Sequence, residues 1–375
     1  MTQFQITINK DYLQLALDPV SRISRDKSAL PILNHALLQA DGERGLAMTG
    51  TNLETQIIAR TITNQTDAPG AIAVHGGKLF DLVRLSPADA SITLKLDGEM
   101  LHVQHGRSRY KLQTRPAEDF PAFDAGDLTH SIQISAIDLL TSLQRVAFCM
   151  ASGDVRHYLN GLAMQLRDGQ LITVASDGHR LATLQIALEG DAQTPKLQII
   201  PRTAVEKITA RLTTLIKAAP RAIVELQIGE RTLSITAGET QLATRLIEGV
   251  YPDAKRVIPT ETPTRLTAHC ASLIAAIERV TVLSDRNEKA IRLDISENGL
   301  ALDAANQDHE SGAETLDLIR FEGAPLSVGF NAHYLLDALR IVSAETVAIH
   351  LSDRSALVVD PDAPGWTAVV MPMRL

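Results

Sequence analysis

The sequence predicts an α+β protein built from three tandem copies of one domain. Two observations carry this prediction. The chain has 375 residues, too many for a single core when domains cluster at roughly 100–150 residues. The same order of strand-like and helix-like patterns also occurs three times, which places the copies at 1–127, 128–250 and 251–375. Each copy is expected to pack two helices against antiparallel sheets.

Each copy begins with a short alternating strand, a polar hinge and a stretch with helical period. The three segments are 4–24 (FQITINKDYLQLALDPVSRIS), 130–150 (HSIQISAIDLLTSLQRVAFCM) and 264–284 (TRLTAHCASLIAAIERVTVLS). A helix that buries one face repeats its apolar residues at i, i+4 and i+7. The first and third segments show this spacing at Leu13, Leu17 and Val20, and at Leu273, Ile277 and Val280.

Two further patterns follow in each copy. The first is strand, polar turn, strand, with Asn52, Asp177 and Asn306 at matching turn positions. The second is a strand that leads into a second helix, at 71–87, 197–215 and 326–343. Two or three β-rich runs follow, and each copy then closes on a proline, a residue that marks strand ends and edges: Pro121, Pro252 and Pro372.

Composition narrows the class of protein. No apolar run approaches the ~20 residues of a spanning helix, and the first residues lack a signal-peptide pattern, so we expect a cytoplasmic protein without membrane contact. Cys149 and Cys270 form no CxxC, and the eleven histidines form no HxxxH, HxH or Cys/His cluster, so neither a metal nor a cofactor is expected.

Charge is distributed unevenly along the chain. The net charge is −8. Residues 1–127 carry 13 basic and 15 acidic side chains, 128–250 carry 12 and 11, and 251–375 carry 11 and 18, which gives −2, +1 and −7. A net negative chain argues against tight nucleic-acid binding, and its aromatic content of 3% argues against single-strand binding by base stacking.

One segment permits a catalytic interpretation. In ITVASDGHRLATLQI, Asp177 and His179 lie two residues apart, and a hydrolase using them, with Asp308 and His309 on a metal, is the alternative function. Asp and Gly are also ordinary turn formers, and the matching turns of the other two copies lack the pair. The chain contains neither GxxxxGK[ST] nor GxSxG.

Four motifs in order on this threefold repeat resemble the bacterial DNA sliding clamp, the beta subunit of DNA polymerase III holoenzyme. They are DVRHYLNG at 154–161, SDGHRLA at 176–182, YPDAKRVIP at 251–259 and VVMPMRL at 369–375. The resemblance implies a non-catalytic processivity factor. Two chains would join head to tail as a closed ring of six domains, with twelve helices lining a hole for duplex DNA. A separate ATP-driven loader would open it.

The resemblance also implies three sets of site residues. A pocket for partner peptides would have donors at its rim (His179, Arg180 and Arg374) and an apolar floor (Leu159, Leu181, Val257 and the two methionines). The pocket set is Arg156, Leu159, Ser176, Gly178, His179, Arg180, Leu181, Pro252, Val257, Val369, Met371, Pro372, Met373, Arg374 and Leu375. The DNA-facing set is Arg25, Lys27, His157, Tyr158, Arg202, Lys207 and Arg211. The dimer set is Lys78, Arg84, Arg107, Arg109, Tyr110, Val282, Leu283, Asp308, Glu310 and Glu314.

In that dimer set, Arg107 and Arg109 are expected to share one face of a strand and to meet the acidic residues of the third copy. The implied partners are duplex DNA without sequence preference and a second copy of the chain. Short clamp-binding peptides would bring further partners: the polymerase III alpha subunit, clamp-loader subunits, other polymerases, mismatch-repair proteins and ligase.

Overall fold

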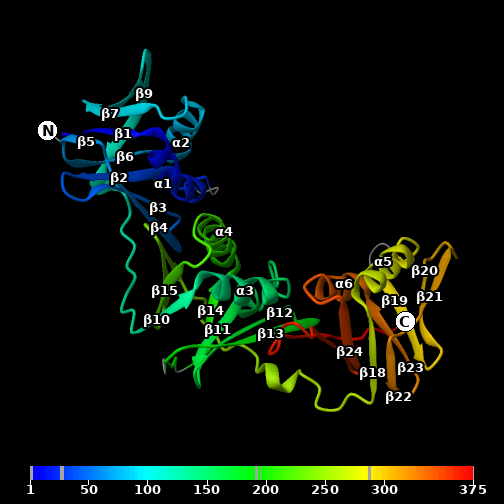
Figure 1. The fold of residues 1–375 in the computed structure, drawn as a ribbon. Helices are drawn as coiled ribbons and strands as arrows, with labels where there is room; N and C mark the ends of the chain where they lie inside the picture. The colour runs from blue at the N-terminus through cyan, green and yellow to red at the C-terminus, as the bar shows by residue number, and fades with distance from the viewer. Residues whose placement is uncertain (1–2, 26–28, 191–192, 195, 286–288, 375) are drawn as a thin grey trace. The chain divides into compact units, whose positions relative to one another are not determined.

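The computed structural model describes the chain except residues 1–2, 26–28, 191–192, 195, 286–288 and 375. The described residues form two compact units (Figure 1). One combines Met1–Ile137 with Glu206–Leu246, and the other combines Asp138–Val205 with Ile247–Leu375. The central repeat therefore contributes to both units, which the repeat pattern did not predict.

The first repeat opens as expected, because the side chain of Asn9 caps α1 by accepting the Asp11 N–H at 2.8 Å. The predicted stripe of Leu13, Leu17 and Val20 is fully buried, and α1 packs against α2. The elements of this repeat are β1 (Gln5–Asn9), α1 (Lys10–Ile23), η1 (Pro31–Asn34), β2 (His35–Asp41), β3 (Gly45–Thr51), β4 (Thr55–Thr61), β5 (Gln65–Ala68), β6 (Gly70–His75), α2 (Gly76–Leu85), β7 (Ser91–Asp97), β8 (Met100–His105), β9 (Ser108–Pro116) and η2 (Ala117–Asp119).

The central and C-terminal repeats follow the same order. In the last repeat the predicted stripe of Leu273, Ile277 and Val280 is buried on α5. The central elements are β10 (His130–Ser135), α3 (Ala136–Ala147), η3 (His157–Leu159), β11 (Gly161–Arg167), β12 (Gln170–Ser176), β13 (Arg180–Ala187), β14 (Gln198–Pro201), α4 (Arg202–Ala218), β15 (Ile223–Ile228), β16 (Thr232–Ala237) and β17 (Thr240–Arg245). The C-terminal elements are η4 (Ala254–Arg256), β18 (Thr264–His269), α5 (Cys270–Thr281), β19 (Ala290–Ser296), β20 (Gly299–Ala305), β21 (Ser311–Leu316), β22 (Arg320–Gly323), β23 (Leu326–Asn331), α6 (Ala332–Leu339), β24 (Thr346–Ser352), β25 (Ser355–Val359) and β26 (Thr367–Val370).

All the pairings between these strands are antiparallel. In the first unit the strands form one sheet in the order β10-β15-β16-β17-β4-β3-β2-β6-β9-β8-β7-β1-β5. In the second unit they form a nine-stranded sheet, β14-β11-β12-β13-β26-β25-β24-β18-β22, and a four-stranded sheet, β21-β20-β19-β23. The fold is thus the predicted α+β arrangement of three tandem copies.

Equivalent turns in the three copies are closed in the same way. The Oδ1 atom of Asn52 accepts the N–H groups of residues 54 and 55, and Oδ1 of Asp177 accepts those of residues 179 and 180. Oδ1 of Asn306 accepts those of residues 308 and 310. A short side chain that bonds to the backbone ahead of it stabilises a turn, so these three residues have a structural role in common.

The last strand of one repeat joins the sheet of the repeat before it. In the first unit β17 pairs with β4, with Thr244 opposite Thr55. In the second unit β26 pairs with β13, with Val370 opposite Arg180. The strand β4 follows the turn of the first repeat, and β13 follows the matching turn of the second. The chain thus follows one pairing rule twice: the last strand of a repeat pairs with the strand that follows the turn of the preceding repeat.

Candidate functional site

The turn between β12 and β13 is held by its own side chains. Asp177 Oδ1 accepts the backbone N–H groups of His179 and Arg180 at 2.9 and 3.0 Å. Ser176 Oγ accepts the Gly178 N–H and donates to the Arg180 carbonyl. Gly178 has φ +90°, a backbone conformation that favours glycine, and a Cβ there would displace the guanidinium of Arg156, whose Nη1 would lie 2.8 Å away.

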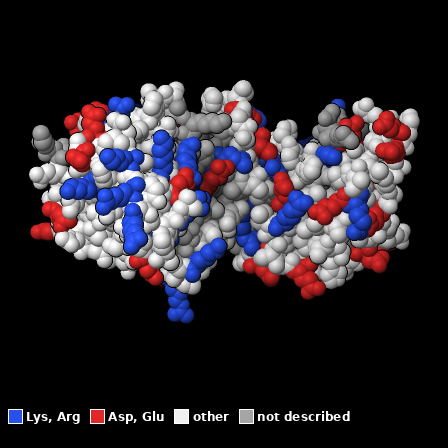
Figure 2. All heavy atoms as spheres, turned by 90° about the horizontal axis from the view of Figure 1, so that it is seen from above, with Lys and Arg blue, Asp and Glu red and all other residues white. Residues whose placement is uncertain are grey.

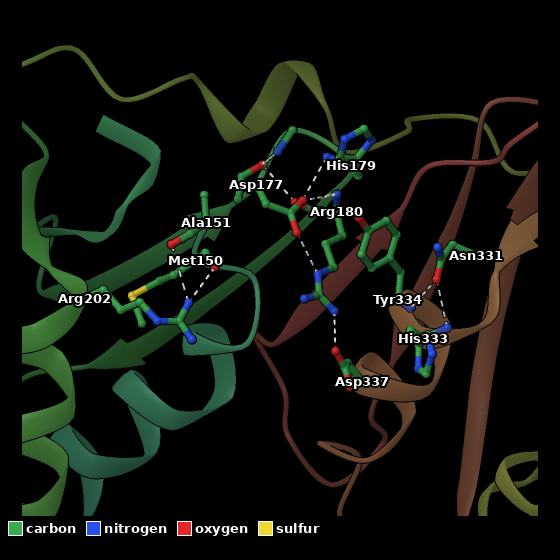
Figure 3. A network of polar contacts seen from close by, with 12 residues as sticks. Met150, Ala151, Asp177, His179, Arg180, Arg202, Asn331, His333, Tyr334 and Asp337 are labelled. Atoms are coloured by element: carbon green, nitrogen blue, oxygen red, sulfur yellow. Dashed lines mark hydrogen bonds and ion pairs between the residues drawn. The ribbon is translucent and has the colours of Figure 1, made fainter. Parts of the chain in front are cut away.

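Arg180 connects this turn to the C-terminal repeat (Figure 3). Its Nε donates to Asp177 Oδ2 at 3.0 Å, and its Nη1 donates to Asp337 Oδ2 at 2.6 Å. The guanidinium also lies over the rings of Tyr334 and Phe148, 4.7 and 5.5 Å from their centroids. Burial opposes the charge, yet the hydrogen bonds to Asp337 and Asp177 raise the Arg180 pKa. The Arg180 side chain is therefore largely buried and links two repeats, and it is not the predicted hydrogen-bond donor at the pocket rim.

The exposed surface at this turn is the ring of His179. It stacks on Tyr334 with centroids 5.8 Å apart and planes 19° apart. Tyr334 lies in the first turn of α6, where Asn331 Oδ1 accepts the N–H groups of residues 333 and 334. Sequence reasoning missed Tyr334, Asn331 and Asp337. The N-cap pattern of asparagine before a helix could have signalled one of them.

Two of the residues predicted to form the apolar floor of the pocket lie in the hydrophobic core instead. Leu159 and Leu181 are 2% and 1% exposed and belong to a cluster closed by Tyr251. The Tyr251 hydroxyl accepts the Ser176 N–H at 2.7 Å, and burial raises the pKa of this phenol above its ordinary value. Val257 is half-buried against the same cluster. The prediction is corrected here: the two leucines support the surface, and Val257 remains available to a ligand.

The chain's last described residues form a wall beside this surface. Val369, in β26, is fully buried. Beyond the strand, Met371 donates its N–H to the His179 carbonyl at 2.9 Å, and Met373 donates to the Gly329 carbonyl at 2.9 Å. Met371, Pro372 and Met373 are half-buried, whereas Arg374 and Pro252 are exposed and Leu375 lies outside the described residues. The tail is thus fixed to both repeats of its unit.

Family models of the DNA polymerase III beta subunit match almost the whole chain. The N-terminal, central and C-terminal domain models match residues 4–124, 133–253 and 255–374. The chain belongs to the DNA polymerase III beta subunit family. It is 35% identical to the beta sliding clamp of Vibrio cholerae and 36% identical to that of Salmonella typhimurium, each over 99% of this chain and 100% of the relative.

Solved structures of this family share the fold. A DnaN sliding clamp from Pseudomonas aeruginosa bound to griselimycin superimposes with a TM-score of 0.94 at 33% identity, over 100% of both chains. The Caulobacter crescentus clamp, with polyethylene glycol bound to its putative beta-motif tethering region, gives 0.92 at 30% identity, also over 100% of both. Sliding clamps of this family are processivity factors of DNA polymerase III and catalyse no reaction, and the chain shares that function.

The hydrolase alternative is not supported. Both carboxylate oxygens of Asp177 bind the turn and Arg180, so the side chain is committed to structure. Within the described part of the chain, His, Cys, Asp and Glu residues form no group of three that could hold a metal ion. No described helix combines the length and apolarity that a membrane crossing requires.

The residues predicted to face DNA lie in different surroundings. His157 is exposed and Tyr158 half-buried in η3, while Arg25 binds Asp81 at 2.7 Å. Arg202 donates to the carbonyls of Met150 and Ala151, as Figure 3 shows, and Lys207 is half-buried. Lys27 lies outside the described residues.

Arg211 is a correction to the DNA-facing set. Its Nη2 donates to the Ala237 carbonyl at 2.9 Å, and burial lowers the pKa of its guanidinium. Its Nε is buried. A side chain held in this way is not free to reach a phosphate, so Arg211 is a structural residue of α4.

The basic residues of the predicted dimer set are exposed. Lys78 and Arg84 are exposed on α2, as are Arg109 and Tyr110 on β9. The expectation for Arg107 is corrected, because it lies with Gly106 in the two-residue turn between β8 and β9. A turn residue does not follow strand alternation, so Arg107 and Arg109 need not share a face.

The apolar and acidic residues lie in the C-terminal repeat. Val282 is 77% exposed, Leu283 is half-buried, and Asp308 and Glu310 are exposed. Glu314 already accepts hydrogen bonds from Nε and Nη2 of Arg279, which lowers the Glu314 pKa. In Figure 2, Lys and Arg gather over the N-terminal part of the chain, at the left, whereas Asp and Glu are prominent over the C-terminal part, at the right.

The edges of β9 and β21 are among the strand edges that lack a ladder partner along most of their length within the described residues. β9 pairs with β8 on one edge over residues 108–113, and its other edge pairs with β6 only at residues 114–116. β21 pairs with β20 alone and ends its four-stranded sheet. An unpaired edge exposes a row of N–H and C=O groups that can bind another chain.

Proposed function

We propose that the surface beside His179 is the pocket through which this clamp binds its clients. The observation that carries the proposal is the tail, whose backbone is hydrogen-bonded to His179 at Met371 and to Gly329 at Met373, so that half-buried methionines follow an exposed histidine along this surface. A flexible thioether adapts to different apolar side chains, which suits a site with several clients. The partners proposed are the polymerase III alpha subunit, clamp-loader subunits, other polymerases, mismatch-repair proteins and ligase.

The peptide class follows from the surface. A Gln followed by spaced Leu and Phe residues would place its apolar side chains against Val257, Met371 and Met373. The exposed ring of His179 and the backbone of the tail would bind the polar groups. Arg156, Ser176, Gly178, Arg180, Leu159 and Leu181 would shape the pocket from below, while Pro252, Val369, Pro372, Arg374 and Leu375 complete its rim.

The dimer would extend the pairing rule found twice inside the chain. β21 follows the turn of the third repeat as β4 and β13 follow theirs, and β9 is the last strand of the first repeat as β17 and β26 are of theirs. We therefore expect β21 to pair with β9 of a second copy. This contact joins the C-terminal repeat of one chain to the N-terminal repeat of the next, so two copies would close a ring.

The rule also gives a register. Ala73, Ile199 and Gly329 hold the same position in their repeats, three residues before the second helix begins. The residues that pair with them, in the same order, are Arg115, Ile247 and Met373, so these three are also equivalent. Three positions earlier lie Leu112, Thr244 and Val370, and the last two face the first residue after the turn, Thr55 and Arg180. The matching residue of the third repeat is Glu310, because the N–H of the turn residue donates to the carbonyl of Thr55, Arg180 and Glu310 in the three copies. Leu112 would then face Glu310, and Arg109 would face Ala313, next to Glu314.

The remaining members of the dimer set would surround this strand pair. Lys78, Arg84, Arg107 and Tyr110 would lie on the basic side, opposite Asp308 and Glu310, and Val282 and Leu283 would add apolar contact. Oppositely charged surfaces favour the correct partner and speed association.

The contact with DNA is proposed to be weak and to involve few phosphates. Arg25, Lys27, His157, Tyr158, Arg202 and Lys207 are the residues proposed to touch the duplex. Few phosphate contacts mean weak, salt-sensitive binding without sequence preference, which suits a ring that slides. The proposed compartment is the cytoplasm.

The proposed domain boundaries fall at 127/128 and 250/251. Support comes from the connecting stretches, since residues 120–129 lie outside helices and strands and residues 246–263 hold only η4.

A topology experiment tests the ring. The clamp is loaded on nicked circular DNA with a clamp loader, the DNA is linearised, and protein retained on it is measured by gel filtration. We expect the protein to leave linear DNA through the ends and to stay when the ends are blocked by bound streptavidin. Retention on unblocked linear DNA would contradict the proposal.

A further inference from the structure

A pocket of about 350 Å³ lies in the first unit, between α1, the end of β4 and the Gly238–Glu239 turn that joins β16 to β17. Tyr12 and Leu15 of α1 and Ile62 after β4 line it, and they are 50%, 61% and 67% exposed. Single exposed apolar side chains are ordinary on a protein surface. Three around one hollow form an exposed apolar patch that another molecule can cover.

Positive charge surrounds these apolar side chains. Arg44, Arg60 and Arg211 line the pocket, whereas Glu239 is the acidic residue among its lining residues. Across the described part of the chain, Arg44 and Arg60 form no ion pair with a carboxylate. Asp18 lies near Arg211 but is already bound to Arg22 at 3.0 Å. The pocket therefore favours a negatively charged ligand.

Arg211 makes this preference stronger. Its guanidinium is fixed by the bond to the Ala237 carbonyl, and its buried Nε has no hydrogen-bond partner among the described residues. A buried donor without a partner is costly, and positive charge without a paired carboxylate leaves the local potential positive. Arg211 therefore adds to the positive potential of the pocket while its side chain stays bound to the Ala237 carbonyl.

We propose that this pocket binds a short acidic segment of a partner protein that presents a large apolar side chain next to one or two carboxylates. The apolar side chain would lie against Tyr12, Leu15 and Ile62, and the carboxylates would pair with Arg44 and Arg60. Duplex DNA fits less well, because it offers phosphates but no apolar group that would fill the hollow. The site is separate from the pocket beside His179 and does not depend on it.

Fluorescence anisotropy of the full-length protein tests the proposal. The probe is a fluorescein-labelled peptide of Glu, Leu and Phe residues, and the protein is titrated into it. An excess of unlabelled Gln-Leu-Phe-type peptide is present throughout, so that the pocket beside His179 is already occupied. Leu15→Ser with Ile62→Ser should weaken binding at least about tenfold, since two apolar contacts are lost. Arg44→Glu with Arg60→Glu should weaken it by a similar factor at low salt.

The matched control is Arg221→Glu with Arg231→Glu, which makes the same charge change at exposed residues of the same unit outside the pocket. It should change the affinity by less than about twofold. The proposal is wrong if the parent protein does not bind the peptide, or if the control loses as much affinity as the pocket variants. It is also wrong if the Arg44 and Arg60 reversals weaken binding of a duplex oligonucleotide while peptide binding is unchanged.

Discussion

Arg180 and Asp337 join two repeats across 2.6 Å, from Nη1 to Oδ2. The Arg180 side chain is only 12% exposed and also binds Asp177, so little water is available to replace a lost partner. The turn that carries His179 and the helix that carries Tyr334 are thus positioned by one guanidinium.

The first prediction concerns this guanidinium. Arg180→Ala should lower the free energy of unfolding by about 2 kcal/mol, because it removes a buried guanidinium from the carboxylates of Asp177 and Asp337 and from the ring of Tyr334. Urea denaturation measures the change, and peptide titration should show weaker binding as the turn shifts. Arg340→Ala is the control, since Arg340 also approaches Asp337, at 3.7 Å, but is half exposed. That change should cost less than about 0.5 kcal/mol, and equal costs would contradict the prediction.

The second prediction concerns acid stability and Asp360. Burial alone would raise the pKa of this carboxyl, but the N–H and hydroxyl of Ser343 and the Arg145 guanidinium hold it at about 2. The ordinary value is 3.8, so the stabilisation is fully present above pH 4 and is lost as pH falls towards 2. This pKa shift corresponds to about 2 kcal/mol in the free energy of unfolding.

Asp360→Asn should therefore be destabilised at pH 7, and its difference from the parent should shrink between pH 4 and pH 2. Unfolding free energies across this range give the comparison. Asp362→Asn is the matched control because Asp362 is an exposed neighbour. A difference for Asp360→Asn that stays constant down to pH 2 would rule out the proposed linkage.

The third prediction concerns the tail. Removing residues 371–375 should abolish binding of Gln-Leu-Phe-type peptides, with at least about tenfold loss of affinity, because the two methionines leave with it. The dimer should persist, since the truncation begins after β26 and its buried Val369 and Val370. Anisotropy and sedimentation measure the two properties. Arg167→Ala, which changes one exposed side chain of the same unit outside the pocket, should bind nearly as well as the parent. Peptide binding that survived the truncation would place the pocket elsewhere.

The fourth prediction concerns the dimer. Arg109→Glu should weaken association, because it would bring a negative charge against the acidic residues of the second copy, and like charges at an interface cost on the order of several kcal/mol. Adding Glu314→Arg to the same chain should restore part of the association by reducing that repulsion. Arg107→Glu, at the turn, should have a smaller effect. Sedimentation at micromolar protein ranks the three variants. An Arg109→Glu chain that dimerises as tightly as the parent would exclude this contact.

Repetition made most of the fold predictable from the sequence. The stripes at Leu13, Leu17 and Val20 and at Leu273, Ile277 and Val280 lie where a period of 3.6 puts them. Turn residues were equally informative, because an Asn or Asp that bonds to its own backbone acts locally.

Side-chain contacts between elements that are distant in the sequence were not predictable in the same way. Arg180 and Arg211 look like surface cations in the sequence, but one is enclosed by Asp337 and Tyr334 and the other by Ala237. Their partners lie 157 and 26 residues away. Nothing local distinguishes such an arginine from one that faces solvent. The prediction for Arg107 was wrong for a different reason, because the turn at residues 106–107 delays the start of β9 to Ser108 and leaves Arg107 outside the strand.

The position of β26 has a consequence for biosynthesis. It is the last strand in chain order, yet it lies between β13 and β25 in the middle of the nine-stranded sheet. During translation the edges of β13 and β25 that face β26 therefore stay unpaired until residues 367–370 have left the ribosome. The wall of the proposed pocket follows β26 directly, so the proposed pocket would form only after both of these sheet edges have been translated.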